Sequence, residues 1–332
     1  GSPFVPGVNT ANILDSEAKL VTMCAKLFGA DPDDVDGYVA TGSSESNACA
    51  VRWAGEKFPN APFIGGASVH YSITRAVKVV GRELLQVEAE KGGAMDMDAL
   101  AHVLAECKGR GVCEVIVMLV CGTTMGEGHD NIDAAIAQLD AAGYDRKHRY
   151  IHVDSAYSGF ILPFLEGVDP GIRVDFRRQG LSSCSASLHK ALGTSAPASV
   201  FLITKSIPKA TFYEYVQTTD VTLSCSRNGH PAFEGWAMLT HILGTGRERW
   251  SARWQQGVSM AAQFATNLKE AGVVNVSHNE SSVTVLFPEP SKLLVVRYSL
   301  VCQDGRAEIM FNFHNLDGKA SNLFFAEYLE WY

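Results

Sequence analysis

Lys190 lies in the segment SASLHKALGTSAP, where an apolar, strand-like run meets a turn of small residues. This is an unusual position for a long charged side chain. Most lysines are solvated surface groups, and Lys190 considered alone would be interpreted in that way. The alternative is a nucleophilic amine that forms an imine with an aldehyde-bearing cofactor. The polar residues on neighbouring elements have to distinguish these two interpretations.

Asp154, in the segment HVDSAYSGF, ends another short apolar run. Its carboxylate is therefore expected at the mouth of a sheet, where a capping or turn role is the simplest explanation. Paired with a lysine one strand away, the same carboxylate is suited to keep a cofactor's pyridine nitrogen protonated, so that the ring accepts electrons. Ala156, two residues further on, would leave room for the face of such a ring.

The segment TGSSESN, Thr41 to Asn47, separates the strand-like Tyr38-Val39 from a helical stretch expected at Ala48 to Lys57. Hydroxyls and backbone amides at a helix N-terminus suit a phosphate, although a single serine there is usually a simple cap. Three serines beside Gly42 favour the phosphate. His70, in SVHYSITRA, precedes another helix, where a polar cap or a packed imidazole is the commoner explanation of an isolated histidine.

These residues are positioned by a chain that alternates strand-like and helix-like segments, the pattern of an α/β fold with a mainly parallel sheet. The expected strands are Glu114 to Val120, Tyr150 to Val153, Ser182 to Ser187 and Ser199 to Thr204, with a helix at Asn131 to Ala142. The first three strands deliver, at their C-terminal ends, Gly122-Thr123-Thr124, Asp154 and His189-Lys190. Ligands bind at this edge of open α/β sheets.

From about Pro231 the pattern changes to long helical stretches, followed by strand-like segments at Ser282 to Phe287 and Glu308 to Phe313. This predicts a smaller C-terminal α+β domain. No internal repeat or low-complexity linker separates the two parts, so we expect them to pack tightly. A helix expected at Ser16 to Phe28 begins close to the start of the chain, so we expect the N-terminal segment to be truncated.

Composition excludes several classes of function. The formal net charge of -8 and the pI near 5.7 come from acids spread along the 332 residues, which leaves no basic surface for nucleic acid. No run approaches the roughly 20 apolar residues that cross a bilayer, and no signal peptide is recognisable, so we expect a soluble, cytoplasmic protein. The eight cysteines show no CxxC pair or metal-ligand spacing, so we expect reduced, mostly buried thiols and no metal site.

Six segments, taken in chain order, carry a family resemblance: GSSESN, VHYS, GTTMGEGHDNI, HVDSA, SASLHK and CSRNGH. Together they resemble the group II pyridoxal-phosphate (PLP)-dependent amino-acid decarboxylases, most closely the branch of bacterial histidine decarboxylase and plant serine decarboxylase. The similarity runs from about residue 15 to residue 315. It implies the aspartate aminotransferase-like fold (fold type I), with a large PLP-binding domain, residues 1–235, built on a mainly parallel seven-stranded sheet. A small C-terminal α+β domain would comprise residues 236–332.

The resemblance also implies a role for each matching residue. Lys190 is the Schiff-base lysine, Asp154 binds the pyridine nitrogen, and His70 stacks on the ring as a catalytic residue, with Ala156 beneath the ring. The residues expected around the phosphate are Gly42, Ser43, Ser44, Ser187 and His189. Those expected near the cofactor's phenolic edge or the substrate are Thr123 and Thr124.

A further segment is implied to act between subunits. Tyr215, in FYEYVQTTD, matches a mobile-loop tyrosine that reaches a neighbouring subunit's site and protonates the intermediate. The segment after this loop resembles the SRNGH of the branch, near the dimer interface. The residues expected at the substrate or the dimer interface are therefore Tyr215, Ser226, Arg227, Asn228 and His230.

Several departures from the family pattern concern the substrate rather than the cofactor. Leu188 replaces the usual glycine before His-Lys, Ser195 to Ser199 replace a Pro-Met-Pro-Cys-Gly run, and Ser155 replaces an alanine. GSSESN is nearer to glutamate decarboxylases. We expect PLP-dependent decarboxylation of an L-amino acid to its amine by a homodimer with shared active sites. Histidine is the leading substrate, and serine, glutamate and aromatic amino acids stay open.

Two other functions are compatible with parts of the pattern. SxxHK and HVDSA also resemble sphingosine-phosphate lyase-like relatives, so another PLP carbon-carbon lyase, or a decarboxylation-dependent oxidative deaminase, is an alternative. The SRNGH and GTTMGEGHDNI segments favour the decarboxylase. A catalytically silent relative that serves as a binding or regulatory subunit is the third hypothesis, and the joint presence of Lys190, Asp154 and His70 argues against it.

Overall fold

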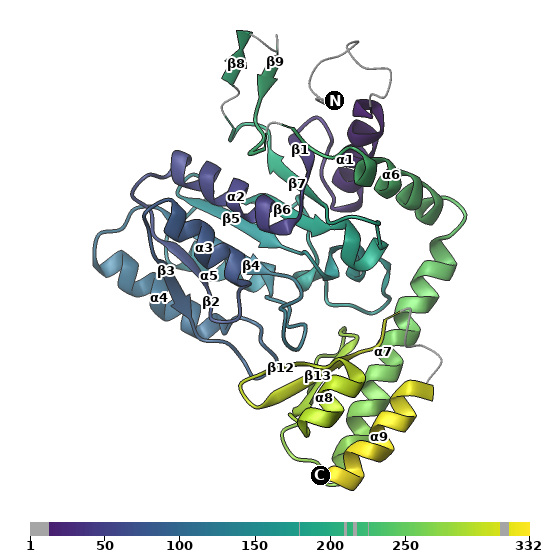
Figure 1. The fold of residues 1–332 in the computed structure, drawn as a ribbon. Helices are drawn as coiled ribbons and strands as arrows, with labels where there is room; N and C mark the ends of the chain where they lie inside the picture. Colours follow the sequence, from purple (N-terminus) through teal and green to yellow (C-terminus); the bar gives the residue numbers. More distant parts are fainter. Residues whose placement is uncertain (1–12, 179, 209–210, 215–217, 225, 313–318) are drawn as a thin grey trace.

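The computed structural model describes residues 13–332 apart from 179, 209–210, 215–217, 225 and 313–318. Its centre is a seven-stranded sheet with the order β1-β7-β6-β5-β4-β2-β3 (Figure 1). The strands are β1 (Val35–Ala40), β2 (Phe63–Gly66), β3 (Leu84–Val87), β4 (Val115–Val120), β5 (Arg149–Asp154), β6 (Leu181–Ser187) and β7 (Ser199–Thr204). The predicted α/β architecture is confirmed.

The sheet is mainly parallel. Strands β3, β2, β4, β5 and β6 run in one direction, whereas β7 is antiparallel to both β6 and β1. Each of the four expected strands is present, with ends that shift by no more than one residue. In β4 every residue is buried, because alternate side chains enter different cores. Val115, Val117 and Leu119 enter one core, and Ile116 and Met118 enter the other.

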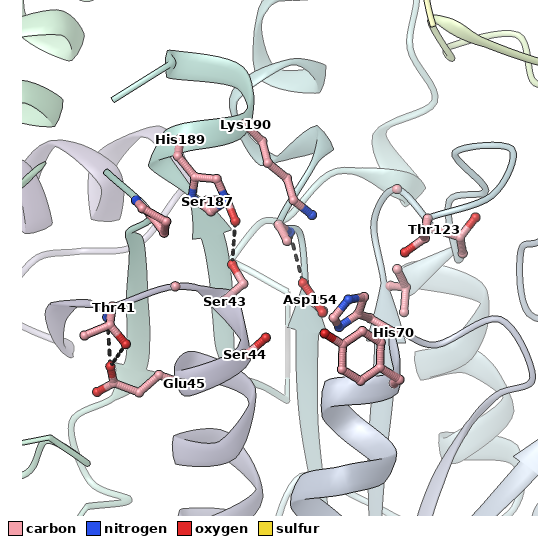
Figure 2. A pocket seen from close by; sticks show the side chains of 17 residues that line it. Thr41, Ser43, Ser44, Glu45, His70, Thr123, Asp154, Ser187, His189 and Lys190 are labelled. Carbon is pink, nitrogen blue, oxygen red and sulfur yellow. Dashed lines mark hydrogen bonds between the residues drawn. The ribbon is translucent and has the colours of Figure 1, made fainter. Parts of the chain in front are cut away.

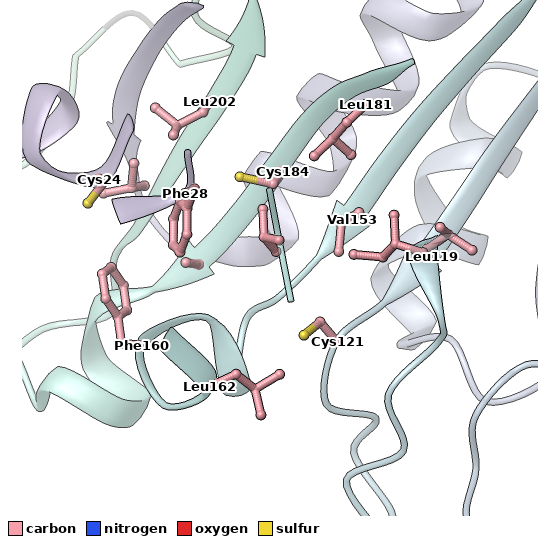
Figure 3. Packing of buried hydrophobic residues seen from close by; sticks show 14 of the residues in the cluster. Cys24, Phe28, Leu119, Cys121, Val153, Phe160, Leu162, Leu181, Cys184 and Leu202 are labelled. Carbon is pink, nitrogen blue, oxygen red and sulfur yellow. The ribbon is translucent and has the colours of Figure 1, made fainter. Parts of the chain in front are cut away.

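Helices cover both faces of this sheet. The face of Ile116 and Met118 is covered by α2 (Ser43–Lys57) and α3 (Tyr71–Val79). The opposite face is covered by α1 (Leu14–Leu27), α4 (Met97–Gly109), α5 (Ile132–Ala141) and α6 (His230–Leu243). Figure 3 shows part of the core on that face, where Phe28 and Phe160 pack near Cys184 and Leu202. The sheet edge that carries the polar residues is therefore fixed by packing from both sides.

Two helices begin earlier than the sequence pattern indicates. Helix α2 begins at Ser43 rather than at Ala48, so Ser43 and Ser44 belong to its first turn and not to a preceding loop. Helix α1 begins at Leu14, two residues before the expected Ser16. Helix α3 follows His70 as predicted, and the imidazole accepts a hydrogen bond from the Ser72 amide at 3.3 Å.

A second, smaller unit follows α6. Helix α7 (Arg247–Glu270) leads into an antiparallel sheet with the order β10-β11-β13-β12. Its elements are β10 (Ser277–His278), β11 (Thr284–Pro288), α8 (Lys292–Tyr298), β12 (Val301–Gln303), β13 (Arg306–Met310) and α9 (Lys319–Trp331). Phe264, Phe287, Phe324 and Tyr328 form a separate core. The predicted small α+β part is present, while the predicted division between residues 235 and 236 falls within α6 and stays a prediction.

The remaining short elements lie between β5 and β7 of the large sheet, or between β7 and α6. They are η1 (Ser158–Phe160), η2 (Leu162–Phe164), η3 (Pro170–Ile172), η4 (Leu188–Leu192), β8 (Thr211–Tyr213) and β9 (Thr218–Asp220). Among the described cysteines, five are buried, Cys302 is partly buried and Cys113 is exposed, as expected for mostly buried thiols. Within the described residues, no helix combines the length and apolar character needed to cross a membrane.

Candidate active site

A cavity of about 320 Å³ opens at the carboxyl ends of β4, β5 and β6, beside the first turn of α2 (Figure 2). Every residue predicted to bind the cofactor lines it: Gly42, Ser43, Ser44, His70, Thr123, Thr124, Asp154, Ala156, Ser187, His189 and Lys190. The other lining residues are Thr41, Glu45, Tyr71, Val120, Gly122 and Pro197. The fold therefore brings together residues that lie far apart in the sequence.

Lys190 enters the cavity from η4, a single π-helical turn that directly follows β6. Such turns are rare and occur frequently at functional sites. The turn is tied to the segment before β7, because the Leu188 amide donates to the Ala198 carbonyl at 2.9 Å and His189 Nδ1 lies 3.0 Å from the same oxygen. Figure 2 shows the amine of Lys190 pointing into the cavity. In the single chain this side chain is exposed.

Asp154 is the last residue of β5, and only 3% of it is exposed. Its Oδ2 accepts a hydrogen bond from Asn47 Nδ2 at 2.6 Å. Its Oδ1 accepts from the Ala156 amide at 3.0 Å and from the Ser185 hydroxyl at 3.3 Å. Three donors on three different segments thus fix the orientation of the carboxylate inside the cavity.

Asn47 also connects Asp154 to His70. The Asn47 amide donates to Ser72 Oγ at 3.0 Å, and Ser72 Oγ lies 2.8 Å from His70 Nδ1. Burial lowers the pKa of His70, and although Asp154 opposes this shift, Lys190 reinforces it. The imidazole is therefore neutral at neutral pH, which suits a ring that lies against another aromatic ring rather than one that carries a charge.

On its other side Asn47 is held by His152, which is fully buried. His152 Nε2 lies 3.0 Å from Asn47 Oδ1, and His152 Nδ1 lies 2.8 Å from Ser183 Oγ. Because the amide oxygen can only accept, His152 Nε2 donates this hydrogen bond. Burial lowers the pKa of His152 to about 4, so the ring stays neutral.

The sequence interpretation missed this network. Two signals were available, because Asn47 lies one helical turn after Ser43 and His152 lies two residues before Asp154 on the same face of a strand. Neither signal identifies the hydrogen-bond partner of Asn47, because Asp154 lies 107 residues further along the chain.

The first turn of α2 offers an anion site. The first backbone amides of a helix have no partner within the helix, and here they belong to Ser43 and Ser44. Ser43 Oγ lies 2.8 Å from Ser187 Oγ at the end of β6, so both hydroxyls meet at this point (Figure 2). Glu45 is turned to Thr41, whose amide and hydroxyl donate to it at 2.8 and 2.7 Å.

The loop after β4 forms another wall of the cavity. Gly122 has a φ of 99°, and a side chain at this position would collide with Ser158. Thr123 is buried and its hydroxyl is used within the loop, where it donates to the Met125 carbonyl at 2.9 Å and accepts from the Gly128 amide at 2.8 Å. Thr124 is exposed. The predicted contact of both threonines with cofactor or substrate stays a prediction.

Four described residues were predicted to contact the substrate or the dimer interface, and they do not line this cavity: Ser226, Arg227, Asn228 and His230. Arg227 forms an ion pair with Glu17 of α1 and donates to the Val39 carbonyl at 2.7 Å, which ties the segment to the large sheet. His230 begins α6, and its Nε2 lies 3.3 Å from Glu234. Tyr215 lies outside the described residues.

The donor set fits PLP. The cofactor needs an amine for its aldehyde, an acid for its ring nitrogen and an anion site for its phosphate, and Lys190, Asp154 and the first turn of α2 supply these groups around one cavity. The volume lies near the lower end of the roughly 300–1,000 Å³ that is usual for small-molecule sites. His70 provides a flat, neutral ring beside Asp154.

Comparison with known proteins supports this fit at the level of sequence. The profile described as "Pyridoxal-dependent decarboxylase conserved domain" matches residues 12–288. Histidine decarboxylase of Pseudomonas entomophila (strain L48) is 29% identical over 317 residues, which cover 94% of this chain and 75% of that protein. Histidine decarboxylase of Morganella morganii is 30% identical over 309 residues, which cover 92% of this chain and 79% of that protein.

Solved structures share the fold. L-methionine decarboxylase from Streptomyces sp. 590 superimposes with a TM-score of 0.82 at 22% identity, covering 99% of this chain and 85% of that chain. Sphingosine-1-phosphate lyase from Burkholderia pseudomallei K96243 gives a TM-score of 0.76 at 17% identity, covering 97% and 78%. At these sequence identities the structural similarity shows only a common fold, fold type I of PLP enzymes. The family follows from the match to the sequence profile. The chain belongs to the pyridoxal-dependent decarboxylase family, as the order of its motifs predicts.

Proposed function

We propose that this PLP-dependent amino-acid decarboxylase removes the α-carboxylate of L-histidine and forms histamine and CO2. The observation that carries the proposal is the one cavity in which Lys190, Asp154 and His70 meet. Histidine is supported as the substrate by the histidine decarboxylases that match 94% and 92% of the chain at 29% and 30% identity.

Different residues of the cavity would hold the aldehyde, the ring nitrogen and the phosphate of PLP. In the proposed arrangement Lys190 bonds to the aldehyde carbon, Asp154 pairs with the ring nitrogen, and the first turn of α2 with Ser43 and Ser187 binds the phosphate. When bound, PLP supplies a protonated ring that accepts the electron pair left by the departing carboxylate. The hydrogen bonds from Asn47, Ser185 and Ala156 hold Asp154 in the position that this requires.

The other steps use groups of the chain. Lys190 would hold the cofactor through its aldehyde, and its amine would serve the release of the product amine. His70 is assigned to the face of the ring, where a neutral imidazole packs without a charge. Tyr215 is assigned to the return of a proton to Cα after CO2 has left.

We also propose that the enzyme works as a homodimer with shared active sites. Tyr71 lines the cavity and is 61% exposed, and Lys190 is exposed as well. A partner chain that covered this wall would bury both side chains, and tyrosine is enriched at the cores of protein interfaces. A second copy of this chain would complete that wall of the cavity.

The test is to incubate the holoenzyme with each common amino acid and to measure CO2 and amine by mass spectrometry. We expect histamine from L-histidine as the main product. A larger yield from serine, glutamate or an aromatic amino acid would overturn the assignment of histidine. Aldehyde with hydrogen peroxide would identify an oxidative deaminase, and turnover of a substrate without a carboxylate would identify a carbon-carbon lyase. If no amino acid yields an amine while PLP stays bound, the proposal fails.

A further inference from the structure

A second cavity adjoins the first one on the side of the smaller unit. It has a volume of about 340 Å³, and it shares Gly122, Thr123, Thr124 and Lys190 with the cofactor cavity. Its other walls come from α7, β11 and β13 through Trp254, Thr284, Glu308 and Met310. The two cavities therefore meet at Lys190 and at the loop after β4, so a substrate held beside Lys190 has the second cavity next to it.

The second cavity is acidic. Glu127 and Glu308 both line it, and they are 1% and 6% exposed. Tyr157 lines it too, and its buried hydroxyl has no hydrogen-bond partner among the described residues. Lys190 is the only cationic side chain among the described residues that line this cavity, and the proposed function assigns Lys190 to the cofactor.

The two carboxylates differ in their partners. Glu127 accepts hydrogen bonds from the Ser282 hydroxyl and the Val283 amide at 2.8 Å each, and from the hydroxyls of Thr284 and Ser158 at 3.2 Å each. These bonds attach the loop after β4 to β11, so Glu127 has a structural role.

Glu308 is held more loosely. It accepts from the Gly126 amide at 3.2 Å, which leaves acceptor capacity for a ligand. Burial raises the pKa of both Glu308 and Glu127 to about 7. His129 Nε2 lies 3.8 Å from Glu127, but burial lowers the pKa of His129 to about 4, so this imidazole is neutral, and no lysine or arginine among the described residues forms an ion pair with either carboxylate. A buried carboxylate without a paired cation is costly, and a cationic ligand would relieve that cost.

We propose that this acidic cavity binds the substrate's side chain and selects side chains that carry a protonated nitrogen, such as an imidazolium, with Glu308 as the acceptor and Tyr157 as the orienting hydroxyl. The inference rests on the proposed function, since the side chain reaches the cavity only when the substrate is bonded to the cofactor. The same charges repel the α-carboxylate of the substrate, so they direct the side chain and not the carboxylate into this cavity.

The decisive variant is Glu308→Gln, which keeps the shape of the side chain and removes its charge. Holoenzyme is titrated at pH 7 with L-histidine and with L-phenylalanine, whose ring is neutral, and Kd is read from the change in the visible spectrum of the cofactor. We expect the Kd of L-histidine to rise by about 10- to 100-fold, the usual effect of losing a charged hydrogen-bond partner, and the Kd of L-phenylalanine to stay unchanged or to fall.

Two further variants accompany this experiment: one is a control for the loss of charge, and the other tests the Tyr157 hydroxyl. Glu289→Gln removes an exposed carboxylate that follows β11 in the same unit, and we expect no change in either Kd. Tyr157→Phe removes only the hydroxyl, and we expect the Kd of L-histidine to rise by about 3- to 10-fold. An equal change for both amino acids in Glu308→Gln, or an unchanged Kd for L-histidine, would overturn the inference.

The two proposals can fail separately. Wild-type holoenzyme that forms no amine from any amino acid contradicts the proposed function, while the titration still reports the charge preference of the cavity. Wild-type holoenzyme that forms histamine, with a Glu308→Gln variant that treats both amino acids as the wild type does, contradicts only the acidic side-chain site.

Discussion

Asn47 stands between the two groups that the proposed chemistry places around the cofactor ring. Its amide donates to Asp154 at 2.6 Å and to Ser72 at 3.0 Å, and Ser72 in turn contacts His70. His152 fixes the orientation of the amide from the other side. Asn47 is thus a positioning residue: it touches neither substrate nor cofactor in the proposed arrangement, but it determines where Asp154 and His70 lie.

We expect Asn47→Ala to weaken PLP binding and to lower kcat by about 10- to 100-fold, because a hydrogen bond to a charged group contributes about 1.5–3 kcal/mol. PLP affinity is measured by titration of the apoenzyme, and kcat with the best amino acid of the panel. The visible spectrum of the bound cofactor should change as well, since the carboxylate beside the ring nitrogen moves. Asn60→Ala, in an exposed turn, is the control. Unchanged PLP affinity and spectrum would contradict the assigned role.

The raised pKa of Glu308 leads to a separate prediction about the stability of the folded protein. The pKa of Glu308 is raised from 4.5 to about 7 by burial, so the folded protein disfavours the ionised form and loses stability as pH rises through that window. The ionisable groups around it are Glu127, Tyr157, Cys302 and Lys190. We expect Glu308→Gln to be more stable than the wild type at pH 8 by ~1–3 kcal/mol and nearly equal to it at pH 4.5.

Urea unfolding of the holoenzyme at both pH values measures this difference, with Glu289→Gln as the control of equal charge change. A variant that is less stable than the wild type at pH 8 would mean that the carboxylate is paired in the free enzyme. The same substitution is thus expected to improve stability and to impair recognition of a cationic side chain, which is common for residues selected for binding.

Sequence reasoning at the residue scale selected side chains that the fold brings together, while the roles assigned to them stay predictions. Lys190, Asp154 and the residues predicted to surround the phosphate all line one cavity, because each follows a strand whose end the apolar pattern predicts. It missed Asn47 and Glu308, because their roles depend on contacts across the fold. Glu308 meets the amide of Gly126 from 182 residues away, and nothing local in the sequence indicates such a contact.

At the scale of elements, the four large-sheet strands were predicted to within one residue, whereas one important helix start was missed. In the smaller unit, β11 and β13 each begin two residues away from the predicted Ser282 and Glu308. Buried strands such as β4 are apolar throughout, so their limits are visible in the sequence. Helix α2 starts with Ser43 and Ser44, and Ser46 and Asn47 follow in the same stretch; these residue types have low helix propensity and favour caps. In the fold Ser43 contacts Ser187 and Asn47 contacts Asp154, and these tertiary contacts compensate for the weak propensity.

Helix α7 approaches the second sheet closely at Gly257. A Cβ at this position would lie 2.5 Å from the Phe311 carbonyl oxygen and 3.1 Å from Val283 Cγ1. In an exposed helix, Gly→Ala stabilises by about 1 kcal/mol. Here we expect Gly257→Ala to destabilise the protein by about 1–3 kcal/mol, because the added methyl group pushes the helix away from the sheet.

The matched control is Gly109→Ala at the exposed end of α4, where an added Cβ meets no atom within 4 Å. We expect this variant to be neutral or slightly more stable. Thermal unfolding of the two variants beside the wild type measures the contrast. Equal behaviour of both variants would mean that α7 moves at little cost, and the acidic cavity between α7, β11 and β13 would then be less rigid than the packing indicates.

The described part of the molecule consists of two units joined by α7: a large unit with a core on each face of its sheet, and a smaller unit with a core of its own. Trp254 and Val258 of this helix pack with a core of the large unit, whereas Ala261, Phe264 and Leu268 pack with the core of the smaller one. The cofactor cavity lies at the edge of the large sheet, and the acidic cavity lies where the smaller unit meets it. In the proposed arrangement the tasks are separated in the same way: the large unit would hold the cofactor, and the smaller unit would supply side chains that contact the substrate.

A second copy of the chain enters the proposal through Tyr215, which the family resemblance assigns to the neighbouring subunit's site. We expect Lys190→Ala to lose the visible absorbance of the lysine-bound cofactor and nearly all turnover while staying folded. We expect Tyr215→Phe to retain that absorbance and to lose most decarboxylation, because the proton donor is missing. Neither variant alone provides a complete site, because every site of the Lys190→Ala protein lacks the lysine and every site of the Tyr215→Phe protein lacks the tyrosine.

Mixing the two variants under conditions that exchange subunits distinguishes shared sites from separate ones. In a heterodimer, the site that contains Lys190 of the Tyr215→Phe chain receives Tyr215 from the Lys190→Ala chain and is intact, whereas the other site carries both defects. Random exchange makes half of the dimers mixed, so activity should recover to about a quarter of the wild-type value. If both residues of a site come from one chain, mixing restores nothing, and the proposal of shared sites fails even if the protein is a dimer.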